Sequence, residues 1–392
     1  MSPPTLDRRG PDGTEEAEGV EGTGGGGSSL VLAYESPVPP HGGYRLRILH
    51  LARALTSLGP VEVAALGEVG DASDEPFSLV GVPHAPSRAR ALLRSVRRPY
   101  LEGLHASPGL AAEARRSHPD VVQISSPFFL DAARATGAPV LFDAHNVEAH
   151  IMATLAATEP RRLHRARWAA EARKLERAER RVAVEVDAIV TTSELDAATF
   201  RSWGARRVEV VPNGVDTAAM PYRPVGPGTT IVYLGQFSYR PNERAAIELI
   251  DDVLPLVRRR VPDAGVELVG RNPGEALRRR VGPGVDVVGA VPDVRPHLHG
   301  ARVLAGPLRA GSGTRLKILE AMAAGVPVVS TPLGAAGIEA RPGDELLIGE
   351  SPRELADHVA TVLEDDALAE RLSHNARAFV EARYDWSVLV PP

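Results

Sequence analysis

The sequence predicts an α/β protein built from two Rossmann-like domains, and three observations support this prediction. In both halves of the chain, short aliphatic or β-branched runs alternate with segments whose apolar residues recur at helical spacing. A Pro- and Gly-rich stretch, 217–229, separates the halves and is expected to be a linker. The 392 residues, 43% of them hydrophobic, are enough for two separate cores.

Composition excludes several classes of protein. The formal charge of −5 argues against a nucleic-acid binder. The absence of cysteine excludes disulfides, zinc–thiolate sites and thiol nucleophiles, and it fits the cytoplasm, where we expect the protein to act. No stretch approaches the roughly 20 apolar residues of a membrane span, and no signal peptide is recognisable. Residues 1–29 are polar and glycine-rich, so we expect a disordered tail there.

The first domain is predicted to span residues 30–216. Its strands are expected at 30–34, 61–66, 120–124, 139–143, 187–193 and 208–211. A helix from 45 to 57 lies between the first two strands, and Gly42 and Gly43 form the turn before it. This order of strand, glycine turn and helix begins a Rossmann-like unit, although the Gly-x-Gly-x-x-Gly fingerprint is absent.

Several charged segments of this domain have two interpretations each. Arg45 and Arg47 follow the glycine turn, so they lie either near a bound anion or in solvent. The arginine-rich stretch 87–118 is favoured as a solvated helix face over an anionic acceptor site or a peripheral membrane contact. The long helix expected from 160 to about 184 carries both signs of charge at spacings of three and four, which favours solvent exposure.

The second domain is predicted to span residues 230–383, with a short tail at 384–392. Its strands are expected at 230–235, 266–271, 285–289 and 326–330. A helix is predicted to follow the first of these strands and to end near Arg260, and the stretch 355–380 is also predicted to be helical.

The most informative segment is a glycine-containing loop followed by a short helix. Arg315 and Lys317 lie in the first turn of this helix, where the macrodipole disfavours cations by up to about 1 kcal/mol each. A bound anion would reverse that preference. The loop supplies backbone amides and hydroxyls for such an anion from Gly311, Ser312, Gly313 and Thr314. Glu320 shares a face with Lys317 and is placed to bind ribose hydroxyls, although a surface helix with a Lys317–Glu320 ion pair is equally open on these residues alone.

The stretch Pro307 to Ser330, with its Thr-Arg-Leu-Lys-Ile-Leu-Glu-Ala-Met-Ala string, resembles the donor-site signature of the retaining glycosyltransferases of family four, which have the GT-B fold. The resemblance covers about residues 30–386. It implies two domains that face each other across a cleft, with the tail at 384–392 crossing back to the first. It also implies a nucleotide-diphosphate sugar bound in the second domain and an acceptor bound in the first.

The resemblance also assigns roles to individual residues. The family motif has two glutamates with seven residues between them; Glu320 matches the second and Ser312 replaces the first, which is a departure on the sugar side. His145, in an Asp-x-His-Asn-x-Glu string at a strand end, matches the histidine that faces the reacting sugar. Arg240 lies one place before a diphosphate-binding lysine of the family, and Val291 lies in the segment whose backbone faces the base.

These matches define a candidate site. The candidate catalytic residues are His145, Lys317 and Arg240. The candidate donor-binding residues are Gly42, Gly43, Gly311, Ser312, Gly313, Thr314, Arg315, Glu320 and Val291. We expect no metal and no cofactor beyond the nucleotide sugar, because the chain has no Asp-x-Asp and offers Arg, Lys and helix amides to the diphosphate instead.

The expected function is transfer of a sugar from a nucleotide-diphosphate sugar to an acceptor hydroxyl, with retention of anomeric configuration and without metal. Two alternatives stay open. One is a nucleotide-sugar binding protein without transfer activity, which the Ser312 departure motivates. The other is a GT-B-fold nucleotide-sugar epimerase. No motif in the first domain identifies the acceptor, which is a small molecule or a glycan.

Overall fold

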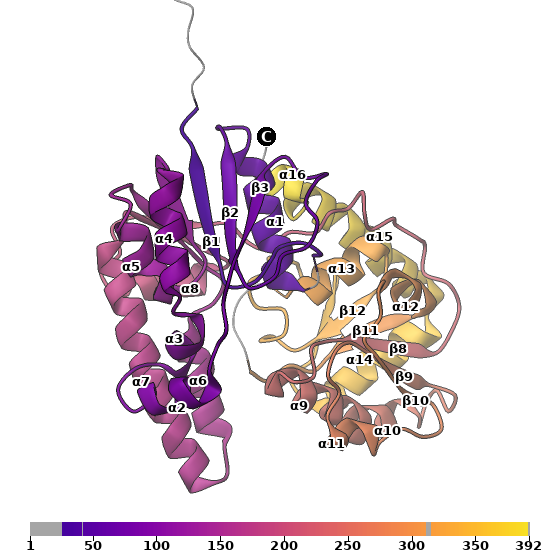
Figure 1. Cartoon of the computed structure of the whole chain (residues 1–392). Coiled ribbons are helices and arrows are strands. Elements are labelled where there is room, and N and C mark those ends of the chain that lie inside the picture. The colour runs from indigo at the N-terminus through magenta and orange to yellow at the C-terminus, as the bar shows by residue number, and fades with distance from the viewer. Residues whose placement is uncertain (1–25, 41, 311–314, 391–392) are drawn as a thin grey trace, which may run out of the picture.

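The computed structural model describes residues 26–40, 42–310 and 315–390. They form two sheets of parallel strands, and helices cover both faces of each sheet (Figure 1). The predicted donor loop, Gly311, Ser312, Gly313 and Thr314, lies outside the described residues. Residues 1–25 of the predicted N-terminal tail also lie outside them. Among the described helices, none combines the length and the apolar character that crossing a bilayer requires.

The first sheet has seven strands in the order β3-β2-β1-β4-β5-β6-β7, all parallel. The strands are β1 (Ser29–Ala33), β2 (Val61–Leu66), β3 (Ser78–Val82), β4 (Val121–Ile124), β5 (Val140–Ala144), β6 (Ala188–Thr191) and β7 (Val208–Val210). Alternate residues of β1 enter different cores: Leu30 and Leu32 join one, and Val31 and Ala33 join the other. This double burial explains the unbroken apolar run that predicted the strand.

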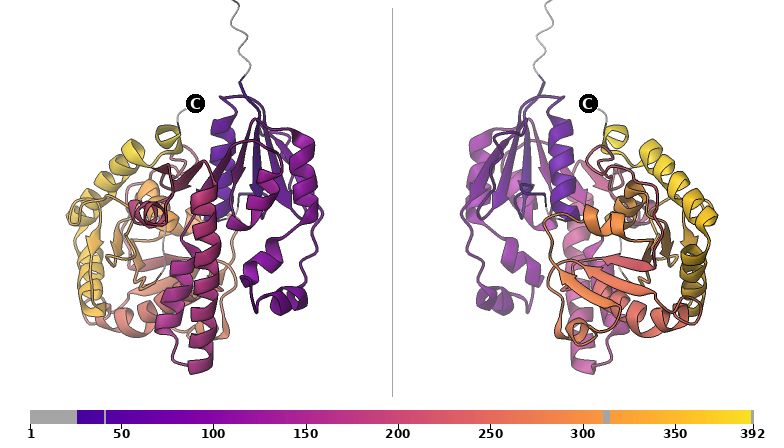
Figure 2. Two further views of the ribbon diagram at one scale, coloured as in Figure 1. Left: turned by 90° about the vertical axis from the view of Figure 1, so that its left-hand side faces the viewer. Right: turned by 90° about the vertical axis from the view of Figure 1, so that its right-hand side faces the viewer.

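Helices pack on both faces of this sheet. They are α1 (Gly43–Leu55), α2 (Arg88–Arg94), α3 (Tyr100–His105), α4 (Pro108–Ser117), α5 (Leu130–Arg134), α6 (Glu148–Thr158), α7 (Arg162–Glu185) and α8 (Glu194–Ser202). Helix α1 covers the face of Val31, while α4, α5, α7 and α8 contribute to the core on the other face. The pair α6 and α7 extends beyond the sheet and lies beside the second domain (Figure 2).

The second sheet has six parallel strands in the order β10-β9-β8-β11-β12-β13. They are β8 (Thr230–Leu234), β9 (Gly265–Val269), β10 (Val285–Gly289), β11 (Val303–Gly306), β12 (Val328–Ser330) and β13 (Leu347–Ile348). Its helices are α9 (Arg240–Glu248), α10 (Leu254–Val257), α11 (Glu275–Arg278), α12 (Arg295–Gly300), α13 (Leu316–Ala324), α14 (Pro352–Glu364), α15 (Asp366–Arg383) and α16 (Trp386–Leu389). A π-helical turn, Leu249–Val253, joins α9 to α10.

The predicted α/β class with two Rossmann-like sheets is confirmed, and three strands were missed. Strand β3 lies at the edge of its sheet and is mostly exposed or half-buried, so it lacks a continuous apolar signal. Strand β11 is buried but has only four residues before the donor-site segment, and β13 has two. The arginine-rich stretch forms the three separate helices α2, α3 and α4.

The chain passes between the domains twice at one place. The backbone N–H of Val215 donates to the carbonyl of Tyr384 at 2.8 Å, and the N–H of Trp386 donates to the carbonyl of Val215 at 3.2 Å. Beyond this crossing, α16 packs on α1, where the ring of Trp386 stacks on that of His50 with centroids 4.8 Å apart. The crossing lies at the opposite end of the molecule from the tip of the α6–α7 pair (Figure 1).

Candidate active site between the domains

A cavity of about 300 Å³ lies between the two domains. Its walls include residues that directly follow β1, β4 and β5 in the first sheet, and residues of the loops after β8 and β11 in the second. They are Tyr34, Ser125, His145, Tyr239 and Leu308. In each sheet the strand order reverses between the first strand and its neighbour on the other side, β1 and β4 or β8 and β11. Doubly wound sheets bind ligands at this point, so the two switch points of this chain face one shared cavity.

Four helices begin at this cavity. Residues at or just before the starts of α1, α6, α9 and α13 line it, and the N-cap residues of α1, α9 and α13 (Gly42, Tyr239 and Arg315) make no side-chain capping bond. The first backbone N–H groups of a helix have no partner within it, and its dipole is positive at that end. The predicted Gly43 permits this convergence, because an added Cβ would lie 2.6 Å from Cδ1 of Leu316 across the cavity. Three converging helix starts favour an anionic ligand.

Lys317 is fixed at the second-domain wall. Its Nζ donates to Oδ1 of Asn242 at 2.8 Å and to the hydroxyl of Tyr233 at 3.1 Å, and it lies 4.2 Å from the centre of the Tyr233 ring. Burial, together with the neighbouring charge of Arg315, lowers the pKa of Lys317 to about 7, although Glu320 acts in the opposite direction. The lysine is therefore held by neutral groups and lacks a full counter-charge, which a phosphate would supply.

The other second-domain candidates surround Lys317 at different depths. Arg315 is the N-cap of α13 and lines the cavity, and burial lowers the pKa of its guanidinium. Glu320 is half-buried one turn further along α13, and burial raises the pKa of its carboxyl while Lys317 lowers it. Val291 is half-buried in the loop after β10 and packs on the core beside α13. Neither Glu320 nor Val291 is part of the cavity lining.

His145 is held from behind by a fully buried ion pair. Asp143 lies at 3.2 Å from Nε2 of His145, and its two oxygens accept from Nε and Nη2 of Arg47 at 2.7 to 3.1 Å. Arg47 and Asp143 have no exposed side-chain surface. Burial alone would raise the pKa of the Asp143 carboxyl, but the charges of Arg47 and His145 hold it well below its usual range. Arg47, expected near an anion or in solvent, instead points into the core.

A stack of rings forms the wall beside His145. The rings of Tyr34 and Tyr44 are 3.8 Å apart at their centroids, and Tyr44 in turn lies 4.8 Å from His145. The Tyr44 hydroxyl accepts from the backbone N–H of Tyr34 at 2.9 Å and lies 2.6 Å from Oγ of Ser125. Since Ser125 donates to the carbonyl of Leu32, its proton is already used, so Tyr44 donates to Ser125. These bonds fix the ring orientations next to the predicted catalytic histidine.

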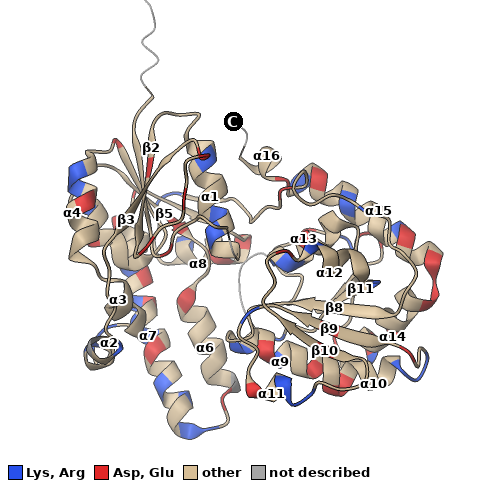
Figure 3. Ribbon diagram, turned by 45° about the vertical axis from the view of Figure 1, so that its right-hand side comes forward, with Lys and Arg blue, Asp and Glu red and all other residues tan. Residues whose placement is uncertain are grey.

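Two carboxyl groups complete the first-domain wall. Glu148 begins α6, and Glu179 of α7 accepts the backbone N–H groups of Glu148 and Ala149 at 2.7 and 3.1 Å. Burial raises the pKa of Glu179 to about 8, with Glu148 adding to the shift and the two N–H donors opposing it. Burial also raises the pKa of Glu148. In Figure 3 the start of α6 is red and the start of α13 is blue, so opposite charges face the cavity from the two domains.

Arg240 lies outside the cavity lining. Its Nη1 is 2.8 Å from Oε2 of Glu159, which follows α6 in the first domain. Glu159 is 3% exposed, and its backbone carbonyl also accepts from Arg165 at 2.9 Å. The structure therefore gives Arg240 a role in joining the tips of the two domains.

We expect Arg240→Ala to open the cavity without destroying the fold. The lost ion pair is partly exposed, so the change in the free energy of unfolding should be about 1 kcal/mol or less. Small-angle scattering should report a larger radius of gyration, and Glu159→Gln should produce the same expansion. Lack of expansion in both variants would show that this contact does not hold the domains together.

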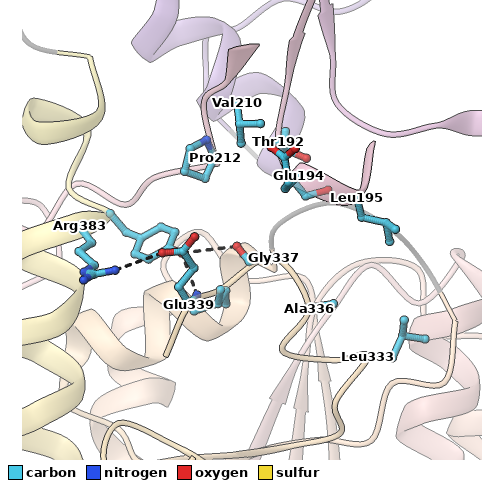
Figure 4. A pocket seen from close by; sticks show the side chains of 13 residues that line it. Thr192, Glu194, Leu195, Val210, Pro212, Leu333, Ala336, Gly337, Glu339 and Arg383 are labelled. Carbon is cyan, nitrogen blue, oxygen red and sulfur yellow. Dashed lines mark hydrogen bonds and ion pairs between the residues drawn. The ribbon is translucent and has the colours of Figure 1, made fainter. Parts of the chain in front are cut away.

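A second cavity, of about 690 Å³, lies on the side of the crossing (Figure 4). The turn after β6 contributes Thr192 and Ser193, the start of α8 contributes Glu194 and Leu195, and the loop after β12 contributes Gly337 and Glu339 among others. Glu339 pairs with Arg383 at 3.1 Å, and the hydroxyl of Tyr384 accepts the Glu339 N–H at 3.0 Å. Oγ1 of Thr192 donates to the carbonyl of His145 at 3.2 Å, which links the walls of the two cavities.

The structure brings some of the sequence-predicted site residues together at this cavity. His145, Gly43, Arg315 and Lys317 line the cavity. Residues missed as site members are Tyr34, Tyr44, Glu148, Glu179, Tyr239 and Asn242. Some signals were present, because Glu148 ends the Asp-x-His-Asn-x-Glu string, and Asn242 ends Tyr-Arg-Pro-Asn. Glu179 gave none, since it lies in a helix of mixed charge 31 residues from the group it caps.

Family models match both halves of the chain. One described as Glycosyltransferase Family 4 matches residues 41–219, and one described as Glycosyl transferases group 1 matches residues 228–365. A phosphatidyl-myo-inositol mannosyltransferase of Mycobacterium tuberculosis is 34% identical over 202 residues, which covers 47% of this chain and 52% of the relative. The corresponding protein of Mycobacterium leprae is 32% identical over 198 residues, with the same coverage. The chain thus spans about half the length of these curated relatives.

Solved structures show the same arrangement of two domains over nearly the whole chain. Anabaena HepE, solved with UDP and glucose, has a TM-score of 0.69 at 16% identity and covers 92% of this chain and 97% of its own. Sucrose-phosphate synthase from Thermosynechococcus elongatus has a TM-score of 0.68 at 18% identity, covering 93% and 96%. TarM has a TM-score of 0.70 at 10% identity, covering 93% and 99%. At these identities the likeness concerns the fold.

Proposed function

Because the chain belongs to the glycosyltransferases of family four and has their GT-B fold, we propose that it transfers a sugar from a nucleotide-diphosphate sugar to an acceptor hydroxyl, with retention of anomeric configuration. The proposed compartment is the cytoplasm. One observation carries the proposal: the cations Arg315 and Lys317 and three helix starts without side-chain caps converge on a cavity at both switch points. This arrangement suits a diphosphate whose negative charge grows as it leaves the sugar.

In the proposed reaction the second domain binds the nucleotide and the first binds the acceptor. Lys317 and Arg315 stabilise the departing diphosphate, and Glu320 binds the ribose one turn further along α13. His145 contacts the reacting sugar from the first domain, with its ring fixed by Asp143 and Tyr44. The acceptor hydroxyl then attacks the anomeric carbon from the face that the diphosphate leaves, and its proton passes to the departing diphosphate. The cations and helix dipoles take the place that a metal ion occupies in other diphosphate sites, so we propose transfer without metal.

We expect a nucleoside diphosphate to raise the melting temperature of the protein in the presence of a chelator. A ligand at 100 times its dissociation constant stabilises a protein by about 2.7 kcal/mol, which thermal unfolding resolves readily. The experiment compares UDP, GDP and ADP, because HepE was solved with UDP and this chain leaves the base open. The diphosphate that binds identifies the donor class, and mass spectrometry of products then separates transfer from epimerisation or binding alone.

Glu320→Ala should weaken that binding roughly tenfold, because one carboxylate that accepts ribose hydroxyls contributes about 1.5 kcal/mol. The matched control is Glu339→Ala, which removes a 79% exposed carboxylate of the same domain that lines the other cavity. Equal affinity in Glu320→Ala and wild type would contradict the ribose assignment. Absence of binding by all three nucleotides to the wild type would contradict the proposed function itself.

A further inference from the structure

From the division of charge across the cavity, we propose that the acceptor is a polyhydroxylated compound that carries an ammonium group, and that Glu148 binds this group. This inference rests on the proposed function and adds a substrate class to it. The acceptor is expected to lie at the first-domain wall of the cavity.

The two walls of the cavity differ in the sign of their charge. The arginine and the lysine of the described lining, Arg315 and Lys317, both belong to the second domain. Both carboxyl groups of the lining, Glu148 and Glu179, belong to the first. An anionic acceptor would meet the carboxylate of Glu148 on the wall where it must bind, which disfavours it.

The two carboxyl groups differ in what they are free to do. Both oxygens of Glu179 accept backbone N–H groups at the start of α6, and its side chain has no exposed surface, so its role is to cap the helix. Glu148 accepts only one long bond, from Nδ2 of Asn146 at 3.5 Å, among the described residues. Glu148 is therefore the carboxyl group that is available to a ligand.

Asp196 contributes negative charge near Glu148, and His150 and Arg315 partly balance the charge of Asp196, whereas no cation is among the groups that shift the pKa of Glu148 in the described part of the chain. Burial raises the pKa of its carboxyl, and Asp196 on α8 adds to the shift. Asp196 is 1% exposed, and its Oδ1 has no hydrogen-bond partner among the described residues. Glu148 in turn raises the pKa values of Tyr34 and Tyr239, so its charge reaches both walls. A half-buried carboxylate without a cation is unfavourable, and a ligand ammonium would supply the missing charge.

The neighbouring groups define the rest of the acceptor. Tyr44 has its hydroxyl committed to Tyr34 and Ser125, and its ring packs between Tyr34 and His145. These contacts fix the aromatic rings of this wall, against which a cyclic molecule could pack. Asn146 and His145 also line the cavity on this side. A cavity of about 300 Å³ suits a ring-sized acceptor beside the donor sugar.

The test measures binding of four related sugars to the protein saturated with the nucleoside diphosphate that stabilises it. The sugars are glucosamine, N-acetylglucosamine, glucose and glucose 6-phosphate, and titration calorimetry below neutral pH keeps the amine protonated. We expect glucosamine to bind ten to a hundred times more tightly than the two neutral sugars, the range for a hydrogen bond between charged groups. Glucose 6-phosphate should bind most weakly.

Three variants show whether Glu148 causes that preference. Glu148→Gln should bind glucosamine and glucose equally, whereas Glu148→Asp should keep part of the preference because it keeps the charge. The matched control is Glu176→Gln on α7, three residues before Glu179. The Glu176 side chain is 41% exposed and lies outside the cavity lining. This control should behave as the wild type does.

The outcomes separate the inference from the proposed function. A preference for a neutral or phosphorylated sugar, no difference among the four, or an amine preference that survives in Glu148→Gln would overturn the inference. Each of these results leaves the proposed function intact as long as the nucleoside diphosphate binds, and that binding is measured first and separately.

Discussion

Arg47→Met is expected to lower the free energy of unfolding by about 3–5 kcal/mol, the cost of leaving one partner of a buried ion pair alone. The Asp143 carboxylate would remain fully buried with only His145 near it. The carbonyl of Val211 and Oδ1 of Asn213 would also lose the donor that lies at 2.8 and 3.3 Å. Urea denaturation followed by tryptophan fluorescence measures the change.

The same helix provides the control for this prediction. Arg45→Met removes an arginine that is 24% exposed and pairs with Glu35 at 2.9 Å, so it should cost less than about 1 kcal/mol. The double variant Arg47→Met with Asp143→Leu should recover most of the stability, because no buried charge is then left unpaired. Similar losses for Arg45→Met and Arg47→Met would contradict the structural importance of the buried pair.

Lys317→Met is expected to reduce kcat/KM for transfer by roughly 10² to 10³, the usual effect of removing one group that stabilises charge on the leaving atoms. The lysine lies at the start of α13 among converging helix starts, so its loss removes a full positive charge from the cavity wall. Lys317→Arg keeps the charge but not the compact ammonium, and it should retain more activity than Lys317→Met. Equal activity in Lys317→Met and wild type would remove this residue from the site.

The lowered pKa of Lys317 adds a pH dependence to this prediction. With a pKa of about 7, the free protein loses the ammonium charge as the pH rises through neutrality, whereas an ordinary lysine stays charged. Affinity for the nucleoside diphosphate should therefore fall above pH 7, by at most tenfold per pH unit. The fall should end at the higher pKa that Lys317 has in the complex, where the bound phosphate stabilises its ammonium form. Lys317→Arg should show no such fall, and a wild-type affinity independent of pH between 7 and 9 would contradict the shift.

The parts of the site that the sequence predicted are those written in short local patterns. Lys317 follows its glycine loop within one helix turn, and His145 follows directly after β5, so spacing alone places one at a helix start and the other at a strand end. The confirmed Rossmann-like sheets follow in the same way from strands that are apolar on both faces. Glu320 and Val291 were identified by resemblance, and their donor contacts stay predictions.

The rest of the site depends on contacts that no local pattern records. Arg47 appeared to be a helix-start cation, but its partner Asp143 is 96 residues away, and only the register of β1, β4 and β5 brings them together. Glu179 reaches the start of α6 because α6 and α7 pack antiparallel, which their sequences do not specify. Arg240 was expected at the diphosphate, and its side chain instead reaches the first domain at Glu159.

The paired crossing of the chain determines how the two domains can move. Backbone bonds tie Val215 to Tyr384 and Trp386, and the side chain of Asp385 accepts from the N–H of Thr217 at 3.0 Å. Both connections between the domains are fastened side by side at this one place. We therefore expect the domains to move relative to each other mainly by rotation about the crossing. Lys317 and His145 line the cavity from different domains, so such a rotation would change the distance between them.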